Sequence, residues 1–296
     1  MKKNSKFSFQ NFWICGLFLI FMLGQALGGD AILLNVANDV EVSTKSGTTK
    51  AQMGQSLENG MRVISRGGTA TILFADGRTL KLPKDQTLNI ESPASVKSAS
   101  TLSRLMGSMS ELLSTSGETH VKGMVRGTDD QGIQLLKPCN TAIRSIEQLE
   151  FQWVRARGME KCSIQIKSRD PSFKYSFSVD AESGSARLPK NAPVLTAGKR
   201  YYWKLTGARD AAAEPIESEL QWFTILEETK AAGLKKDLEL IESLNQLEPK
   251  DRNYLAGVVL GSYELFSEAI ELIKKHPDDP GIKNLLQGLA RRQLSE

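Results

Sequence analysis

The chain has 296 residues, and its 38 lysines and arginines nearly balance its 34 aspartates and glutamates. This length allows two or three domains with ordinary hydrophobic cores. Removal of the first 28 residues would take three lysines from the net charge of +4 and leave +1, and no basic run indicates nucleic acid or an anionic membrane as a partner.

The chain begins with the features of an export signal. Lys2, Lys3 and Lys6 precede an apolar run from Phe12 to Leu23, which ends in the small-residue stretch GQALGG. This order predicts a signal peptide over residues 1–28. The run is shorter than the about 20 residues that a membrane helix needs, so cleavage is favoured over a retained anchor. We therefore expect a periplasmic or otherwise exported cell-envelope protein without a transmembrane helix after cleavage.

Residues 31–91 alternate short apolar runs with turn signals, which predicts an all-β domain. The stretch ATILFADGRTLKL is a hairpin whose turn can close in two ways. A two-residue loop at Asp76 and Gly77 would split the apolar residues between two faces. A three-residue loop with Gly77 in the left-handed conformation keeps them on one face. It pairs Phe74 with Arg78, Ile72 with Leu80 and Ala70 with Leu82. We therefore interpret Asp76 and Gly77 as turn formers.

A stretch from about residue 35 to residue 91 resembles the FecR-like β domain of bacterial envelope proteins. The residues that carry the resemblance are Gly54, Leu57, Gly60, Val63, Ser65, Ala70, Ile72, Phe74, Asp76, Gly77, Leu80 and Leu82. FecR-type sensors relay outer-membrane transport to a sigma factor through a cytoplasmic region that precedes their membrane helix. Only residues 1–11 precede the apolar run here. The resemblance therefore implies an exported, stand-alone use of the module.

Residues 92–132 are rich in Ser, Thr and Gly and predict a linker with one helix over 101–114. Within that helix, apolar residues recur every three or four positions and form one face. The face could lie on a membrane or bind a partner, but the helix lacks a basic flank. We expect the face to pack on the N-terminal β domain.

Residues 133–227 contain seven strand-like segments at the spacing of an immunoglobulin or fibronectin β-sandwich. The alternation predicts that Tyr201 and Trp203 face inward and that Trp153 packs against them across the sheets. The pattern does not determine whether Tyr202 and Trp222 face the core or the solvent. The stretch LTAGKRYYWKL is similar to the corner and strand of fibronectin type III domains in which a leucine, a turn glycine and a tyrosine recur. Here these are Leu195, Gly198 and Tyr201, and Ala197 stands where that family usually has proline.

Two cysteines, Cys139 and Cys162, remain after signal removal. Export would place them in an oxidising compartment, where they could form a disulfide; two buried free thiols are the alternative. The two histidines, His120 and His276, are far apart and lack ligand-type neighbours, so the sequence predicts no metal site.

Residues 228–296 change to a helical period, and we expect a short α-helical bundle. The apolar residues of the expected first helix are Leu234, Leu238, Ile241 and Leu244. Tyr254, Ala256, Gly257, Leu260, the segment 267–270 and Pro277 resemble one tetratricopeptide-like helical hairpin. Ile282, Leu285, Leu286 and Leu289 predict a last helix. Fewer than three repeats are present, so the sequence does not distinguish a capping bundle from a peptide-binding groove.

The chain lacks a phosphate-binding glycine loop, a nucleophile elbow, a zinc-protease motif and paired Cys-x-x-Cys motifs. We therefore expect no catalytic, cofactor-binding or metal-binding residues. The favoured function is a non-enzymatic envelope protein that binds or scaffolds protein partners or cell-wall glycan. A FecR-type signalling regulator and an unrecognised hydrolase of envelope polymers are the alternatives.

Overall fold

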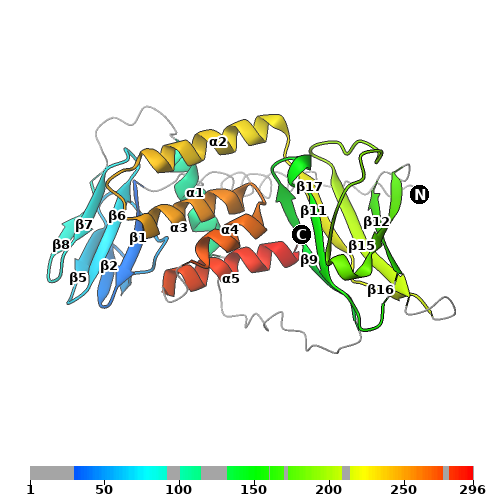
Figure 1. Cartoon of the computed structure of the whole chain (residues 1–296). Helices are drawn as coiled ribbons and strands as arrows, with labels where there is room; N and C mark the ends of the chain where they lie inside the picture. Colours follow the sequence, from blue (N-terminus) through cyan, green and yellow to red (C-terminus); the bar gives the residue numbers. More distant parts are fainter. Residues whose placement is uncertain are drawn as a thin grey trace, which may run out of the picture.

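The computed structural model describes residues 30–91, 101–114, 132–159, 161–169, 173–208, 214–275 and 280–295. They form three parts in a row, with a helical bundle between two β units (Figure 1). We call these parts the N-terminal β unit (30–91), the helical bundle (101–114 with 228–295) and the central β unit (132–227). The predicted signal peptide over residues 1–28 lies outside the described residues, as do His120, His276 and most of the predicted linker.

The described residues of the N-terminal β unit form two four-stranded antiparallel sheets, in the orders β4-β1-β6-β7 and β3-β2-β5-β8. The apolar core between the sheets includes Leu33, Val42, Val63 and Ile72, which are fully buried. The all-β structure predicted for these residues is confirmed. The strands are β1 (Ala31–Ala37), β2 (Val40–Thr44), β3 (Gly47–Lys50), β4 (Ser56–Leu57), β5 (Arg62–Ser65), β6 (Thr69–Phe74), β7 (Thr79–Leu82) and β8 (Thr87–Asn89).

The β6–β7 hairpin closes through a three-residue loop. The Phe74 N–H donates to the Arg78 carbonyl at 2.9 Å, and the Gly77 N–H donates to the Phe74 carbonyl at 2.9 Å. Gly77 has a φ of +88°, a conformation that side chains with a Cβ rarely adopt. Along the hairpin, Ile72 pairs with Leu80 and Ala70 pairs with Leu82. The predicted register is therefore confirmed.

The described residues of the central β unit form two facing sheets, β14-β11-β9 and β10-β17-β15-β12-β13, with β16 paired to β15. The seven segments predicted as strands are all strands, and β10 and β16 are additional. The strands are β9 (Gln134–Lys137), β10 (Thr141–Ile143), β11 (Glu150–Val154), β12 (Lys161–Ser168), β13 (Lys174–Asp180), β14 (Ser185–Arg187), β15 (Arg200–Ala208), β16 (Ile216–Glu217) and β17 (Gln221–Ile225).

The core of the central β unit is aromatic. Tyr201 and Trp203 on β15 and Trp153 on β11 are all buried in it. Phe151, two residues before Trp153, supplies the ring that lies edge-on against Trp203, with 4.8 Å between the ring centroids. The indole N–H of Trp203 donates to the Pro138 carbonyl at 2.7 Å, so this buried polar group is satisfied.

The helical bundle consists, in the described residues, of α1 (Thr101–Ser114), α2 (Glu228–Ser243), α3 (Pro249–Ser262), α4 (Phe266–Ile273) and α5 (Pro280–Ser295). Most of the predicted stripes are buried, with Leu234, Ile241, Ile282 and Leu289 in the core, whereas Leu238 and Leu286 are half-buried. The prediction for α1 is only partly right: its first turn reaches the β6–β7 turn, but it packs mainly on α3 and α5. Within the described part of the chain, no helix is long and apolar enough to span a membrane.

One apolar core runs through all three parts. Ile32 and Leu34 on β1 and Leu73 on β6 point away from the N-terminal sandwich and belong to the same buried cluster as the helices. Trp222 on β17 belongs to it from the other side, so the bundle covers the outer faces of both β units. This arrangement places one sheet of each β unit between two apolar layers, which explains why residues 31–34 of β1 and 72–74 of β6 are apolar on both faces.

Polar contacts reinforce the junction between the bundle and the central β unit. The Ala142 N–H donates to the Glu264 carbonyl at 2.8 Å, and Arg144 forms an ion pair with Glu268 at 2.9 Å. The Arg200 guanidinium lies 3.6 Å from a Glu264 carboxylate oxygen and forms a second ion pair across the junction. The two parts therefore meet through backbone and charge contacts as well as through the shared core.

Candidate functional site

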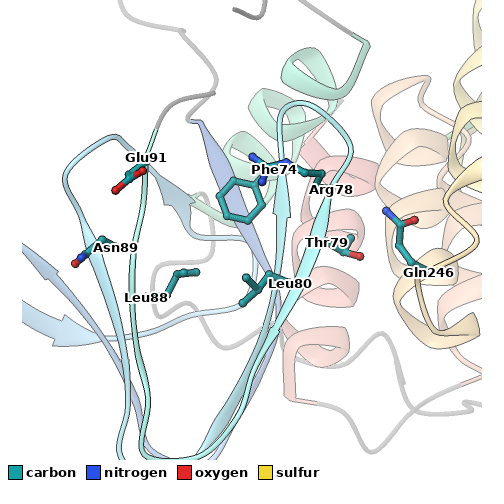
Figure 2. Close-up of a pocket in the computed structure, with 8 residues that line it drawn as sticks. All are labelled: Phe74, Arg78, Thr79, Leu80, Leu88, Asn89, Glu91 and Gln246. Carbon is teal, nitrogen blue, oxygen red and sulfur yellow. The ribbon is translucent and has the colours of Figure 1, made fainter. Parts of the chain in front are cut away.

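The described residues form a groove with a volume of about 540 Å³ at one edge of the N-terminal β unit. β7 is the last strand of one sheet and β8 is the last strand of the other, and the groove lies where the sandwich opens between them. Figure 2 shows the two strands running side by side with their side chains around this opening. The volume lies within the range of about 300–1,000 Å³ that is usual for ligand sites. The lining residues are Phe74, Arg78, Thr79, Leu80, Leu88, Asn89, Glu91 and Gln246.

The floor of the groove is apolar. Leu80 and Leu88 point toward one another from the two strands, and Phe74 lies above them (Figure 2). Phe74 is buried, whereas Leu80 and Leu88 are half-buried. Because the two sheets diverge here, these leucines line the exposed margin of the sandwich core. The floor can therefore take up further apolar side chains.

Arg78 is held in place at the rim. Its guanidinium lies 5.1 Å from the centroid of the Phe74 ring, and its Nε donates to an Asp76 carboxylate oxygen at 2.6 Å. The Arg78 backbone N–H also donates to Asp76 at 3.0 Å. Burial acts to raise the pKa of Asp76, but these hydrogen bonds and the charge of Arg78 outweigh it and lower the pKa. Asp76 therefore shapes the turn and orients Arg78.

The loop between α2 and α3 forms a second wall beside β7. The Gln246 side-chain amide donates to the Gly77 carbonyl at 2.9 Å, and Lys81 pairs with Glu248 at 2.5 Å. The hydrogen bond and charge of Glu248 raise the pKa of Lys81, and Lys81 in turn lowers the pKa of Glu248. The helical bundle thus contributes directly to the groove.

A smaller cavity, of about 270 Å³, lies where the bundle meets the central β unit. Arg104 on α1 and Tyr263 after α3 both line it. Both also contact Asp237 on α2, which accepts from Arg104 at 2.6 Å and from the Tyr263 hydroxyl at 2.8 Å. Burial and the hydrogen bond to Asp237 raise the pKa of Tyr263, against a lowering effect of Arg104. These groups hold three segments of the bundle together, so we assign this cavity to packing.

Only part of the predicted set of residues lies at the groove. Asp76 and Gly77 form the turn at its rim, whereas Trp153, Tyr201 and Trp203 lie in the core of the central β unit. Gly198, with a φ of +80°, is in the turn before β15 and lines the smaller cavity.

Of the two alternatives for Cys139 and Cys162, the structure has the free thiols, and no disulfide joins them. Cys162 is buried on β12 and contacts the Val179 carbonyl, whereas Cys139 is half-buried and contacts the Leu135 carbonyl. Burial raises the pKa of each thiol to about 11, with the charge of Asp180 adding to the effect at Cys162. Both side chains therefore act as packed, weakly reactive groups.

Sequence reasoning missed most of the groove. Leu88 and Asn89 lie in a short strand and Glu91 just after it, where no local pattern indicates a role, and Gln246 lies 169 positions from its partner Gly77. The one available signal was Arg78, a charged residue that follows the Asp-Gly turn directly. Among the described residues, no group of three or more His, Cys, Asp or Glu side chains could hold a metal ion.

Comparisons with known proteins assign the chain to no family. No protein-family model and no curated protein matches it. Among solved structures, a β-1,2-glucanase from Parabacteroides distasonis aligns with 90% of this chain at 8% identity and a TM-score of 0.24. The chain spans 59% of the length of that structure. A similarity this low carries no argument about fold or activity.

Proposed function

We propose that the protein is a non-enzymatic scaffold of the cell envelope that binds protein partners or cell-wall material. The observation that carries this proposal is the continuous apolar core through the helical bundle and the outer faces of both β units. Such a core holds the two units at a constant separation and orientation, because sliding one past the other would expose buried apolar surface. A fixed spacing between two modules is useful for a protein that presents surfaces to partners.

The groove supports the same proposal. Its floor is apolar, its polar groups sit on the rim, and it opens at the margin of a β-sandwich. Its two charged side chains, Arg78 and Glu91, come from different strand ends, and Arg78 is already paired with Asp76. This composition suits recognition of a surface or a chain segment.

The proposal includes the module assignments made from the sequence. We propose that the N-terminal β unit is a stand-alone FecR-like module and that the central β unit is a fibronectin type III-like sandwich. In support of the second assignment, the Thr196 N–H donates to the Tyr201 hydroxyl at 2.7 Å, as in the tyrosine corner of immunoglobulin-like sandwiches. We also propose that residues 1–28 are an export signal and that the helices form a capping bundle.

A retention experiment tests the function. The processed chain is immobilised and exposed separately to solubilised envelope proteins and to purified cell-wall polysaccharide, with an unrelated β-sandwich protein of similar charge as the control. We expect saturable retention of one protein or glycan without release of cleavage products. Retention of neither class would contradict the proposal, and release of reducing sugar or peptide would favour a hydrolase. Sequencing of the exported product should find a new N-terminus near residues 26–29.

A further inference from the structure

We propose that the groove between β7 and β8 binds an extended peptide segment of a protein partner by strand addition, with aliphatic side chains at alternate positions. This inference rests on the proposed binding function and names the class of ligand. It follows from three features of the groove: free strand edges, an apolar floor and an unbalanced carboxylate.

The free edge of β7 presents backbone groups to the groove. Among the described residues, β7 pairs only with β6. The Phe74–Arg78 pair is hydrogen-bonded, so the alternation of antiparallel strands turns the N–H and C=O of Leu80 toward β6 and those of Thr79 outward. Thr79 lines the groove. An added strand would therefore find a donor and an acceptor there.

The free edge of β8 has the same property. The Ile90 N–H donates to the Met61 carbonyl, and the Ser65 N–H donates to the Gln86 carbonyl. Even-numbered residues of this strand therefore face β5, and the backbone groups of Asn89 face outward. Asn89 also lines the groove. The opening is thus bordered by two free edges rather than one.

The side chains between these edges define what an added strand must carry. Leu80 and Leu88 are half-buried and face one another across the opening, so aliphatic side chains on one face of an extended peptide would complete the sandwich core. The opposite face of the peptide would meet Thr79 and Gln246, which are polar. Alternate apolar and polar residues are therefore the matching pattern.

Charge selects one end of the peptide. Arg78 is paired with Asp76 at 2.6 Å, so its charge is balanced within the protein. Glu91 is exposed at the other end of the groove, and no ion pair joins it to another described residue. A lysine or arginine near that end of the peptide would balance this carboxylate.

A glycan is a poorer fit for the same groove. Sugars commonly stack on open aromatic faces, but Phe74 has 6% of its surface exposed and Arg78 lies over its ring. Phe74 is also the one aromatic side chain among the described lining residues. The groove therefore offers edges and aliphatic contacts, which suit a peptide backbone.

A synthetic peptide of alternating Val and Thr with a terminal Lys, labelled with fluorescein, is the probe. Its binding to the processed chain is measured by fluorescence anisotropy. Two further versions carry N-methyl groups on either the Val or the Thr backbone nitrogens. We expect saturable binding, with about ten-fold or greater loss for at least one N-methylated version because it removes the edge hydrogen bonds. Equal binding of all three versions, or no binding at about 1 mM peptide, would overturn the proposal.

Proline substitutions locate the binding edge. Thr79→Pro and Asn89→Pro each remove an outward N–H without removing a bond to the neighbouring strand. Thr48→Pro makes the same change at the distant edge strand β3, and thermal unfolding checks that all three variants fold. We expect loss of binding of about ten-fold for Thr79→Pro, Asn89→Pro or both, and none for Thr48→Pro. Glu91→Gln should reduce binding about two- to five-fold and weaken its salt dependence.

The outcomes separate this inference from the proposed function. If the chain retains an envelope protein and the proline variants retain it equally well, strand addition is wrong while binding stands. If cell-wall polysaccharide competes with the peptide and the Thr79→Pro or Asn89→Pro variant loses the polysaccharide, the groove is a glycan site and the peptide assignment is wrong.

Discussion

The guanidinium of Arg104 lies 2.6 Å from both carboxylate oxygens of Asp237, although the two residues are 133 positions apart in the sequence. The Asp237 side chain is almost fully buried, whereas Arg104 remains largely exposed. The pair ties α1, which follows the N-terminal β unit, to α2, which follows the central β unit. The bundle is therefore assembled from both halves of the chain.

Tyr263 should give the fold a dependence on alkaline pH. Burial and the hydrogen bond to Asp237 raise its pKa in the folded protein, while the unfolded chain ionises near pH 10. The folded state therefore holds this proton more tightly. The resulting stability is complete below about pH 10 and is lost as the pH rises through the higher folded pKa. We expect the melting temperature to fall less steeply above pH 10 in Tyr263→Phe than in the wild type.

Tyr202→Phe is the control for this pH experiment, because Tyr202 is half-buried against the bundle and no described hydrogen bond holds its hydroxyl. Its melting curve series should keep the wild-type slope between pH 8 and 12. Identical slopes for Tyr263→Phe and the wild type would mean that another group controls alkaline unfolding.

Tyr201→Phe should destabilise the central β unit by about 1–3 kcal/mol, because the Thr196 N–H would lose its acceptor in a partly buried turn. The ring itself would still fill the core beside Phe223, which is 5.5 Å away between centroids. Urea unfolding followed by tryptophan fluorescence measures the change. Tyr202→Phe, one residue along the same strand, should stay within about 0.5 kcal/mol of the wild type.

Two glycines on packed helices should respond in opposite ways to alanine. A Cβ at Gly288 would lie 2.6 Å from the Leu112 carbonyl oxygen, so Gly288→Ala should push α5 from α1 and cost about 1–3 kcal/mol. No atom lies within 4 Å of a Cβ at Gly107, so Gly107→Ala should stabilise α1 by about 0.5–1 kcal/mol. Chemical denaturation of both variants tests the pair. Stabilisation by Gly288→Ala would contradict the close approach of these helices.

The two thiols should react slowly in the folded protein. With a pKa of about 11 for Cys139 and Cys162, the thiolate fraction at pH 8 is roughly a hundred-fold smaller than for an ordinary cysteine. Iodoacetamide labelling should therefore be slow at pH 8 and should accelerate as the pH rises toward 11. Peptide mass spectrometry after unfolding without reductant should find both residues alkylated. A peptide pair linked through Cys139 and Cys162 would instead show a disulfide.

The features that could be predicted from the sequence are those that depend on a few adjacent residues. The β6–β7 register followed from the left-handed turn at Gly77 and from keeping Ile72 and Leu80 on one face, both of which depend on a few adjacent residues. The strands of the central β unit followed in the same way from alternation, and Tyr201 lies in the core as its position predicted.

The contacts between parts could not be predicted in this way. The apolar face of α1 indicates that something covers it, but the identity of α3 and α5 as partners depends on packing between segments far apart in sequence. The burial of Ile32, Leu34 and Leu73 beneath the bundle has one local signal in the sequence, the apolar runs 31–34 in β1 and 72–74 in β6. The groove depends on where two sheets end and on the position of Gln246, and neither has a local signature.

The shared core also sets an order for assembly during synthesis. Ile32, Leu34 and Leu73 are made early, but of the helices that share their core only α1 follows soon after, and α2 to α5 begin only at residue 228. A chain that stops after the central β unit would leave the apolar outer face of β1 and β6 in contact with water. Nonsense truncations before α3 should therefore yield aggregates rather than smaller working proteins, and chaperones should engage the emerging chain until its last helices arrive.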